Sequence, residues 1–305
     1  MRLPKFIISY GGRSMLLSTI TETFLLERSV ARYSPNTLRD YRVTFTKLVN
    51  FLGDVEFREI TRSRIVEFFD QQPVSAKTLR NYHTDLSALW QWAKQEGLCE
   101  ENLIRSIRPP IVEKKEVVPF NRVEILALLD QVTKTNNPIV ALRNKAILYV
   151  LLDTGVRASE LCGLRIQDIN QVTMHIMVFG KGKKERHIPI SQMTLAAIQD
   201  YLKQRGGKSE WVFVTMNNHR PINRIRLGSI LEKIGKQAGI GHVYPHRFRH
   251  TFAIQFLRNG GNIYSLQRIL GHTTLDMVKR YLAISQIDLD RDHAVASPVT
   301  CWLGH

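Results

Sequence analysis

The stretch Pro245-His246-Arg247-Phe248-Arg249-His250-Thr251 begins a predicted helix in the C-terminal third of the chain. Proline favours the first helical position, because its missing N–H would be unsatisfied there in any case. Residues three apart then share one face, which places His246 beside Arg249 and turns Arg247 elsewhere. A guanidinium fork and an imidazole on one face suit a phosphate group. The alternative is an arginine-rich helix that grips a polyanion without catalysing a reaction.

Two more residues, further toward the C-terminus, extend this pattern. His272 follows Gly271 in a predicted turn, and Tyr281 lies on the helix predicted after it, beside Met277 and Val278. A phenol has a pKa of about 10, so its attack on phosphorus at neutral pH requires nearby cations or a base. Taken alone, Tyr281 is an ordinary core or surface tyrosine.

Two further cations lie upstream. Arg157 follows a helix break at Gly155 and precedes a new helix, so it projects from a helix N-terminus, which is a good phosphate site. Glu160 is placed to brace it. Lys181 lies between glycines in a predicted turn and can protonate a leaving oxygen. The alternatives are a buried structural Arg157–Glu160 pair and a solvated basic turn that only holds a nucleic-acid backbone.

The composition indicates a globular protein with a polyanionic partner. The 305 residues are 44% apolar and 23% charged, which suits two domains with separate cores. The net charge of +16 favours nucleic acid over a membrane surface, because the Lys and Arg residues are spread along the whole chain. Cys99, Cys162 and Cys301 show no metal-type spacing and suit a reducing cytosol. The apolar stretch among the first residues is too short and too interrupted for a signal peptide or membrane span.

The N-terminal third is predicted to be all helical. Ser34-Pro35-Asn36-Thr37-Leu38 is a helix start with a capping serine, and Gly53 ends that helix. Other helices are expected at about 19–32, 62–70 and 75–97, from apolar residues at three- and four-residue spacing. Basic residues on the solvated faces are predicted to bind DNA: Arg39, Arg42, Lys77 and Arg80.

The rest of the chain is predicted to be mostly helical with a small antiparallel sheet. Pro109-Pro110 begins an extended linker. Two strands, 174–179 and 185–190, are expected around a glycine-containing turn, with a third at 212–214. Helices are expected at the remaining positions: from 121, and at 138–154, 224–238, 247–259, 263–270, 275–284 and 287–295. The fold class is therefore mainly α, with a small helical domain followed by a larger mixed domain.

His242, His246 and His250 recur at four-residue steps, which raises the alternative of a zinc site. Pro245 opposes it, because the residue before a proline is steered away from helix, and that leaves His242 in a loop. No acidic or cysteine ligand follows at a useful spacing. We predict that the chain binds neither a metal nor another cofactor.

Together these motifs make the chain resemble the tyrosine recombinases, the phage-type integrases and Xer-like proteins. The resemblance covers nearly everything after about residue 15. It implies a disordered extension at 1–15, a SAM-like core-binding domain at 16–108, a linker at 109–119, a catalytic domain at 120–293 and a tail at 294–305 for subunit contact. The residues that carry it are Thr154-Gly155-Val156-Arg157-Ala158-Ser159-Glu160-Leu161, Gly180-Lys181-Gly182-Lys183-Lys184-Glu185-Arg186, His246-Arg247-Phe248-Arg249-His250, Leu270-Gly271-His272 and Tyr281.

The resemblance also implies a mechanism. Arg157 and Arg249 would clamp the scissile phosphate of double-stranded DNA, His246 and His272 would complete its cradle, Lys181 would be the general acid and Tyr281 the nucleophile. Glu160 falls where the family carries a supporting acid, and Lys183, Lys184 and Arg247 are predicted to contact DNA. The implied enzyme recombines sites through a 3′-phosphotyrosyl intermediate in the cytoplasm, as a tetramer on DNA, with accessory DNA-bending or directionality proteins as partners.

Three other functions remain open on the sequence alone. A type IB topoisomerase shares the tyrosine chemistry but relaxes supercoils without pairing two sites. A non-catalytic DNA-binding protein keeps the basic surface and has no use for Tyr281. A transcription regulator needs a recognition helix-turn-helix and an effector pocket, and neither is recognisable in the sequence.

Overall fold

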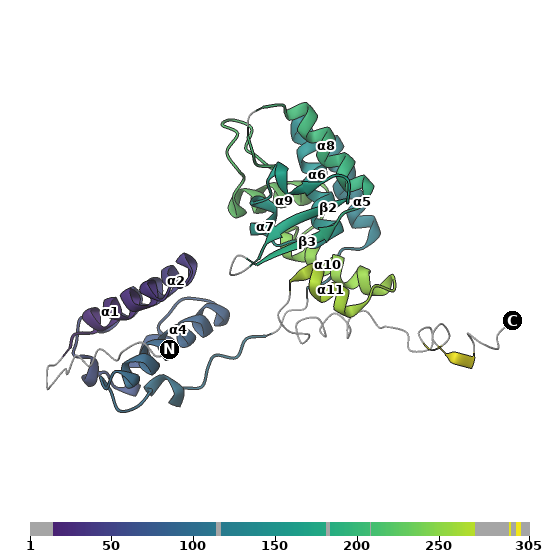
Figure 1. The fold of residues 1–305 in the computed structure, drawn as a ribbon. Coiled ribbons are helices and arrows are strands. Elements are labelled where there is room, and N and C mark those ends of the chain that lie inside the picture. Colours follow the sequence, from purple (N-terminus) through teal and green to yellow (C-terminus); the bar gives the residue numbers. More distant parts are fainter. Residues whose placement is uncertain are drawn as a thin grey trace. The chain divides into compact units, whose positions relative to one another are not determined.

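The computed structural model describes residues 15–113, 117–180, 184–207, 209–271, 293 and 297–299. The chain divides into two compact units, one ending at Lys115 and the other beginning at Glu116. This division falls within the stretch predicted to be a linker. Each unit buries its own apolar core, and in Figure 1 the strands belong to the second unit. Within the described residues, no helix is long and apolar enough to cross a membrane.

Over residues 15–113, the first unit is a bundle of four α-helices, as predicted. They are α1 (Leu17–Val30), α2 (Pro35–Leu52), α3 (Arg62–Asp70) and α4 (Ala76–Gln95), with a short 3₁₀ turn at Phe57–Glu59 between α2 and α3 and another at Leu103–Ser106 after α4. The Ser34 side chain accepts a hydrogen bond from the Thr37 amide and caps α2, which confirms the helix start proposed from the sequence.

Aromatic rings form the centre of this bundle. The Phe24 ring lies edge-on to Tyr41, Phe45 and Trp92, with centroids 5.2, 5.6 and 5.6 Å away. Edge-to-face packing favours such pairs beyond the area that they bury. The Trp92 indole N–H also donates to the Glu27 carboxylate at 2.7 Å, which ties α4 to α1. The apolar faces of the helices are thereby used internally, and their basic residues are left at the surface.

The second unit is built around one apolar helix, α6 (Pro138–Thr154). Its buried side chains include Ile147, Val150 and Leu151, and it packs against α5 (Arg122–Thr133), α8 (Gln192–Arg205) and α10 (Pro245–Arg258). The other helices among the described residues of this unit are α7 (Ala158–Cys162), α9 (Arg224–Gln237) and α11 (Ile263–Leu270), with a 3₁₀ turn at Ile166–Asp168. Helix α8 is absent from the sequence-based prediction, although Ser191 caps it and Leu195, Ile198 and Tyr201 form its buried face.

A three-stranded antiparallel sheet completes the second unit. Its strands are β1 (Ile169–Asn170), β2 (His175–Phe179) and β3 (Glu185–Pro189), in that order, with Ile176 opposite Ile188. Strands β2 and β3 confirm the predicted hairpin, and they lie beside α7 and α11 respectively (Figure 1).

The third strand predicted at 212–214 is wrong. Val212, Phe213 and Val214 are fully buried but form no strand, since Val214 makes only an isolated antiparallel bridge with Pro221 and the Val212 amide donates to Leu164. Burial, and not strand pairing, accounts for their apolar character.

Candidate active site

The turn after α6 sets the position of Arg157. Gly155 ends the helix in the left-handed region at φ 59°, and the chain then enters α7, whose N-cap is Arg157. The Arg157 amide donates to Glu160 Oε2 at 2.8 Å, and its Nη1 donates to Glu160 Oε1 at 2.9 Å. One carboxylate thereby fixes both ends of Arg157. The arginine side chain remains 36% exposed, so part of its guanidinium faces solvent beside a helix N-terminus.

Glu160 is held by a second arginine that the sequence reasoning did not assign. Arg186 on β3 donates from Nη1 and Nη2 to the two Glu160 oxygens, both at 2.8 Å, and from Nε to the Ile269 carbonyl at 2.7 Å. The Glu160 side chain is only 1% exposed. Burial raises its pKa, but the hydrogen bonds and charges of Arg186 and Arg157 outweigh burial and lower the pKa below 4.5. The carboxylate is therefore ionised at neutral pH.

Arg249 reaches the same region from α10. Its Nη1 donates to the Gly155 carbonyl and its Nη2 to the Leu270 carbonyl, each at 2.8 Å, and the residue is 4% exposed. Arg157 Nη2 in turn donates to the Gly271 carbonyl at 3.3 Å. Two guanidiniums from distant parts of the sequence thus meet at the same two turns, one after α6 and one after α11. This is the convergence that a two-arginine phosphate clamp requires.

His246 lies in the first turn of α10, three residues before Arg249, and is exposed to solvent. The other three predicted catalytic residues, Lys181, His272 and Tyr281, lie outside the described residues, as does Lys183. Gly180 and Lys184, on either side of the segment that holds Lys181, and Gly271, just before His272, are described. The Gly180 amide donates to the Lys184 carbonyl at 2.8 Å, and Gly271 lies against the Arg186 guanidinium.

The predicted DNA-contacting residues occupy different environments. Arg39 and Arg42 on α2, Lys77 and Arg80 on α4, and Lys184 beside the hairpin turn are all exposed.

Arg247 differs from them, because it is only 8% exposed. Its guanidinium donates to the carbonyls of Val118 and Gly241 and to Glu124 Oε1, at 2.9, 3.0 and 2.8 Å, and lies 3.8 Å from the centre of the Phe120 ring. These contacts commit the Arg247 side chain to joining α10 to the start of the unit, which leaves little of it for a DNA surface.

The histidines considered for zinc do not form a cluster of ligands in the described part of the chain. His242 lies in the loop before α10 with φ 56°, and His250 is buried within α10. Among the described residues, no group of three or more His, Cys, Asp or Glu side chains is placed to hold a metal ion.

Comparison with known proteins identifies the family. Residues 120–286 match the phage integrase family, and residues 16–108 match the phage integrase SAM-like domain. The tyrosine recombinase XerA of Pyrococcus furiosus is 31% identical over 88% of this chain and 91% of its own length. The chain belongs to the phage integrase family of tyrosine recombinases.

Other relatives agree with this assignment. The tyrosine recombinase XerC of Oceanobacillus iheyensis is 28% identical over 93% of this recombinase and 96% of its own chain. The Tn1549 transposon integrase, solved in complex with circular intermediate DNA, shares the fold with a TM-score of 0.72 and 22% identity, over 88% of this recombinase and 95% of that chain. The protein is a tyrosine-type site-specific recombinase.

Arg186 is the main residue of this site that sequence reasoning missed. It stands in the quoted run from Gly180 to Arg186, five residues after Lys181, and a strand places alternate residues on one face. That pattern shows on which face of the strand Arg186 lies, but it does not reveal that the carboxylate it meets is Glu160.

Proposed function

We propose that the recombinase cleaves and rejoins double-stranded DNA with Tyr281 as nucleophile and with Arg157, Arg249, His246 and His272 around the scissile phosphate. The observation that supports this most directly is the meeting of Arg157 and Arg249 at the turns after α6 and α11. Their charges stabilise the negative charge that develops on the phosphoryl oxygens in the transition state.

The proposed first step forms one bond and breaks one. The Tyr281 phenol gives its proton to a nearby base or to solvent and its oxygen attacks phosphorus, the bond from phosphorus to the 5′ oxygen breaks, and Lys181 gives its proton to that oxygen. A 3′-phosphotyrosyl ester and a free 5′ hydroxyl result. A 5′ hydroxyl from the second duplex then attacks the ester and releases the tyrosine. One phosphoester replaces another at each step, so the cycle needs no nucleotide hydrolysis.

We further propose that Arg39, Arg42, Lys77, Arg80, Lys183 and Lys184 hold the DNA backbone. The net charge of +16 supports this, since Lys and Arg gain free energy by releasing the counterions condensed on phosphates. Joining two duplexes requires several protomers, so we infer a tetramer on DNA, assisted by accessory proteins and acting in the cytoplasm.

A covalent-trapping experiment tests the nucleophile. The recombinase is incubated with a nicked duplex that carries its recombination site, and protein–DNA adducts that survive SDS are counted. We expect wild type and Tyr264→Phe, whose tyrosine is 61% exposed on α11, to form the adduct, and Tyr281→Phe to form none. An adduct that persists in Tyr281→Phe contradicts the assignment.

A plasmid with two sites distinguishes recombination from relaxation. We expect recombinant products with wild type, because the enzyme pairs two sites. Relaxed plasmid without recombinants contradicts this expectation and favours a topoisomerase.

A further inference from the structure

A cavity of about 560 Å³ lies in the second unit, between the C-terminal end of α5, the first turns of α6 and one face of α9. Cavities of this volume are typical of small-molecule sites. The active-site turn follows the other end of α6, which at 17 residues spans about 25 Å. The cavity is therefore separate from the Arg157 and Arg249 site.

The wall of this cavity contains a buried positive charge with no described counter-ion. Arg143 is 4% exposed, and its Nε and Nη2 donate to Asn144 Oδ1 at 3.2 and 2.9 Å, while Nη1 reaches the Val214 carbonyl at 3.5 Å. These acceptors are neutral. A buried charge is costly unless an opposite charge or strong hydrogen bonds compensate it. Burial lowers the pKa of Arg143, and the nearby Arg226 lowers it further.

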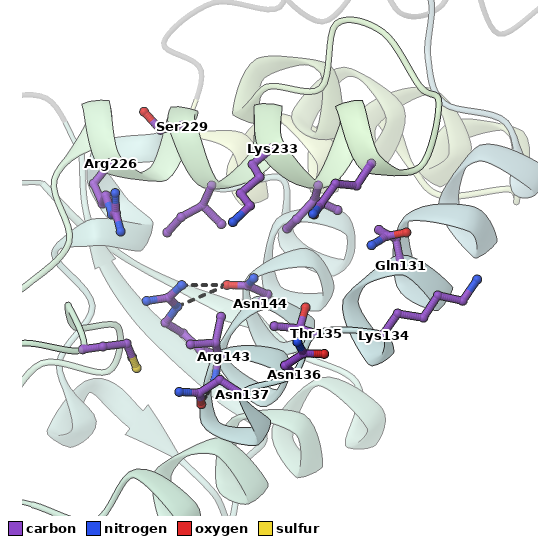
Figure 2. Close-up of a pocket in the computed structure, with 15 residues that line it drawn as sticks. Gln131, Lys134, Thr135, Asn136, Asn137, Arg143, Asn144, Arg226, Ser229 and Lys233 are labelled. Carbon is purple, nitrogen blue, oxygen red and sulfur yellow. Dashed lines mark hydrogen bonds between the residues drawn. The ribbon is translucent and has the colours of Figure 1, made fainter.

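Two more cations face the same space. Figure 2 shows Arg226 and Lys233 directed from α9 toward Arg143 on α6. No Asp or Glu is among the described residues that line the cavity. A second lysine at the rim, Lys134, is paired with Asp130 at 2.6 Å and points away from the other three cations (Figure 2). Positive charge is therefore concentrated where described acidic side chains are lacking.

The rest of the lining suits the uncharged part of such a ligand. Side-chain amides of Gln131, Asn136 and Asn144 offer hydrogen bonds, and Val140 and Ile230 supply apolar surface. The positive end of the α6 dipole adds to the field of the three cations, because Val140 belongs to the first turn of that helix.

We propose that this cavity binds a phosphate-bearing small molecule of about nucleotide size, with Arg143, Arg226 and Lys233 around its phosphate groups. A small anion is favoured over a DNA backbone because Arg143 is buried, and a duplex presents its phosphates to exposed side chains. Guanidinium forks bind phosphate oxygens in pairs, which three converging cations allow for a diphosphate or triphosphate.

The test uses inorganic pyrophosphate as the probe, titrated into the full chain by calorimetry at constant ionic strength. We expect one saturable site per chain. The variant Arg226→Gln/Lys233→Gln removes two exposed cations from the cavity and should weaken pyrophosphate binding about tenfold or more. The matched control Arg224→Gln/Lys236→Gln removes two exposed cations from the same helix, outside the cavity. It should change the affinity for pyrophosphate by less than about twofold.

Arg143→Met provides a second variant that keeps side-chain length and removes the buried charge. It should abolish pyrophosphate binding while the chain still unfolds cooperatively, because losing the buried charge offsets the loss of its hydrogen bonds to Asn144 and Val214. Equal binding by the two double variants, or no saturable binding by wild type at millimolar pyrophosphate, overturns the proposal. So does a cavity variant that loses affinity for duplex DNA and retains affinity for pyrophosphate, because the cavity then belongs to the DNA surface.

Discussion

Glu160 connects three chain segments that are far apart in sequence. Its carboxylate accepts from the backbone and side chain of Arg157 at the start of α7 and from both Nη atoms of Arg186 on β3. Arg186 extends the network to the Ile269 carbonyl in α11. Strand β3 and the Arg157 turn therefore share one buried carboxylate, and Arg186 links it to the end of α11. We infer that a side chain in this position acts on the proposed reaction by positioning Arg157, without touching DNA itself.

Arg186→Lys tests that positioning role. Lysine keeps the charge but cannot form two parallel bonds to Glu160 while also reaching Ile269. We expect the rate of covalent adduct formation in single-turnover assays to fall about tenfold or more, while the dissociation constant for site DNA changes by less than about twofold. Arg165→Lys is the matched control, because Arg165 is 41% exposed and pairs with Glu210 at 3.4 Å. This variant should leave both the rate and the dissociation constant unchanged. Parallel losses of rate and affinity in Arg186→Lys would count against a positioning role.

The ionised state of Glu160 predicts a pH dependence of stability. Its folded-state pKa is depressed, so its contribution is complete above the unfolded value of 4.5 and is lost as pH falls through the lower folded value. At pH 7, Glu160→Gln should destabilise the second unit by about 3 kcal/mol, because two arginines lose a buried partner.

Urea unfolding monitored by hydrogen exchange in the second unit measures this difference. The difference in unfolding free energy between wild type and Glu160→Gln should be the same at about pH 7 and pH 5.5. It should become smaller only below about pH 4.5. The control is Glu210→Gln, because the Glu210 side chain is 58% exposed. Its unfolding free energy should differ from that of wild type by less than about 1 kcal/mol at every pH. A gap for Glu160→Gln that widens in acid would refute the assignment of the charged state.

At the scale of elements, the α6–α7 turn depends on a glycine. Gly155 has φ 59°, and a Cβ there would lie 2.6 Å from Phe252 Cδ1 and 3.0 Å from Leu270 Cδ2. Gly155→Ala therefore combines left-handed strain with overpacking, and we expect the second unit to lose about 2–4 kcal/mol of unfolding free energy. Its carbonyl also accepts from Arg249, so adduct formation should fall as well.

Gly239→Ala is the matched control for this prediction. Gly239 has φ 70°, but a Cβ at this position would have no neighbouring atom within 4 Å, so only strain of about 1 kcal/mol is expected. Thermal unfolding and the adduct assay measure both variants. If Gly155→Ala proves no worse than Gly239→Ala, the close approach to Phe252 does not constrain this turn.

The elements that the sequence predicts well are those with strong local determinants. Ser34 before Pro35, and Asn137 before Pro138, mark helix starts that any packing would preserve. The strand wrongly predicted at 212–214 is apolar for reasons of burial, and local patterning cannot distinguish a buried loop from a strand. Helix α8 has a cap and an apolar spacing that are both visible in the sequence, so it could have been predicted.

The candidate site, like the fold, could be predicted from the sequence only in part. Motif spacing predicts which residues bear phosphate chemistry, because Arg157 stands at the N-cap of α7 and Arg249 lies three residues after His246 in α10. Their tertiary partners depend on how distant segments pack. The carbonyls of Gly155 and Leu270 that receive Arg249, and the buried position of Arg247, follow from that packing and from no local pattern.

At the scale of the whole molecule, two separate cores are joined by one linker. The first unit packs its helices around Phe24 and Leu86, and the second packs its own around α6, including Leu151. Domains with separate cores fold and open as separate cooperative units. The stability of each unit should therefore respond only to changes in its own core.

Two fully buried leucines allow this to be tested in the intact chain. Leu86→Ala in the first unit and Leu151→Ala in the second each remove a 0% exposed side chain and should cost about 3–5 kcal/mol. Hydrogen exchange followed by mass spectrometry should show faster exchange in peptides from 15–113 for the first variant and from 117–271 for the second. Loss of protection in both units from either substitution would mean that the cores open together. We therefore expect the network around Glu160 to stay intact when the N-terminal bundle opens, because its described hydrogen bonds lie within the second unit.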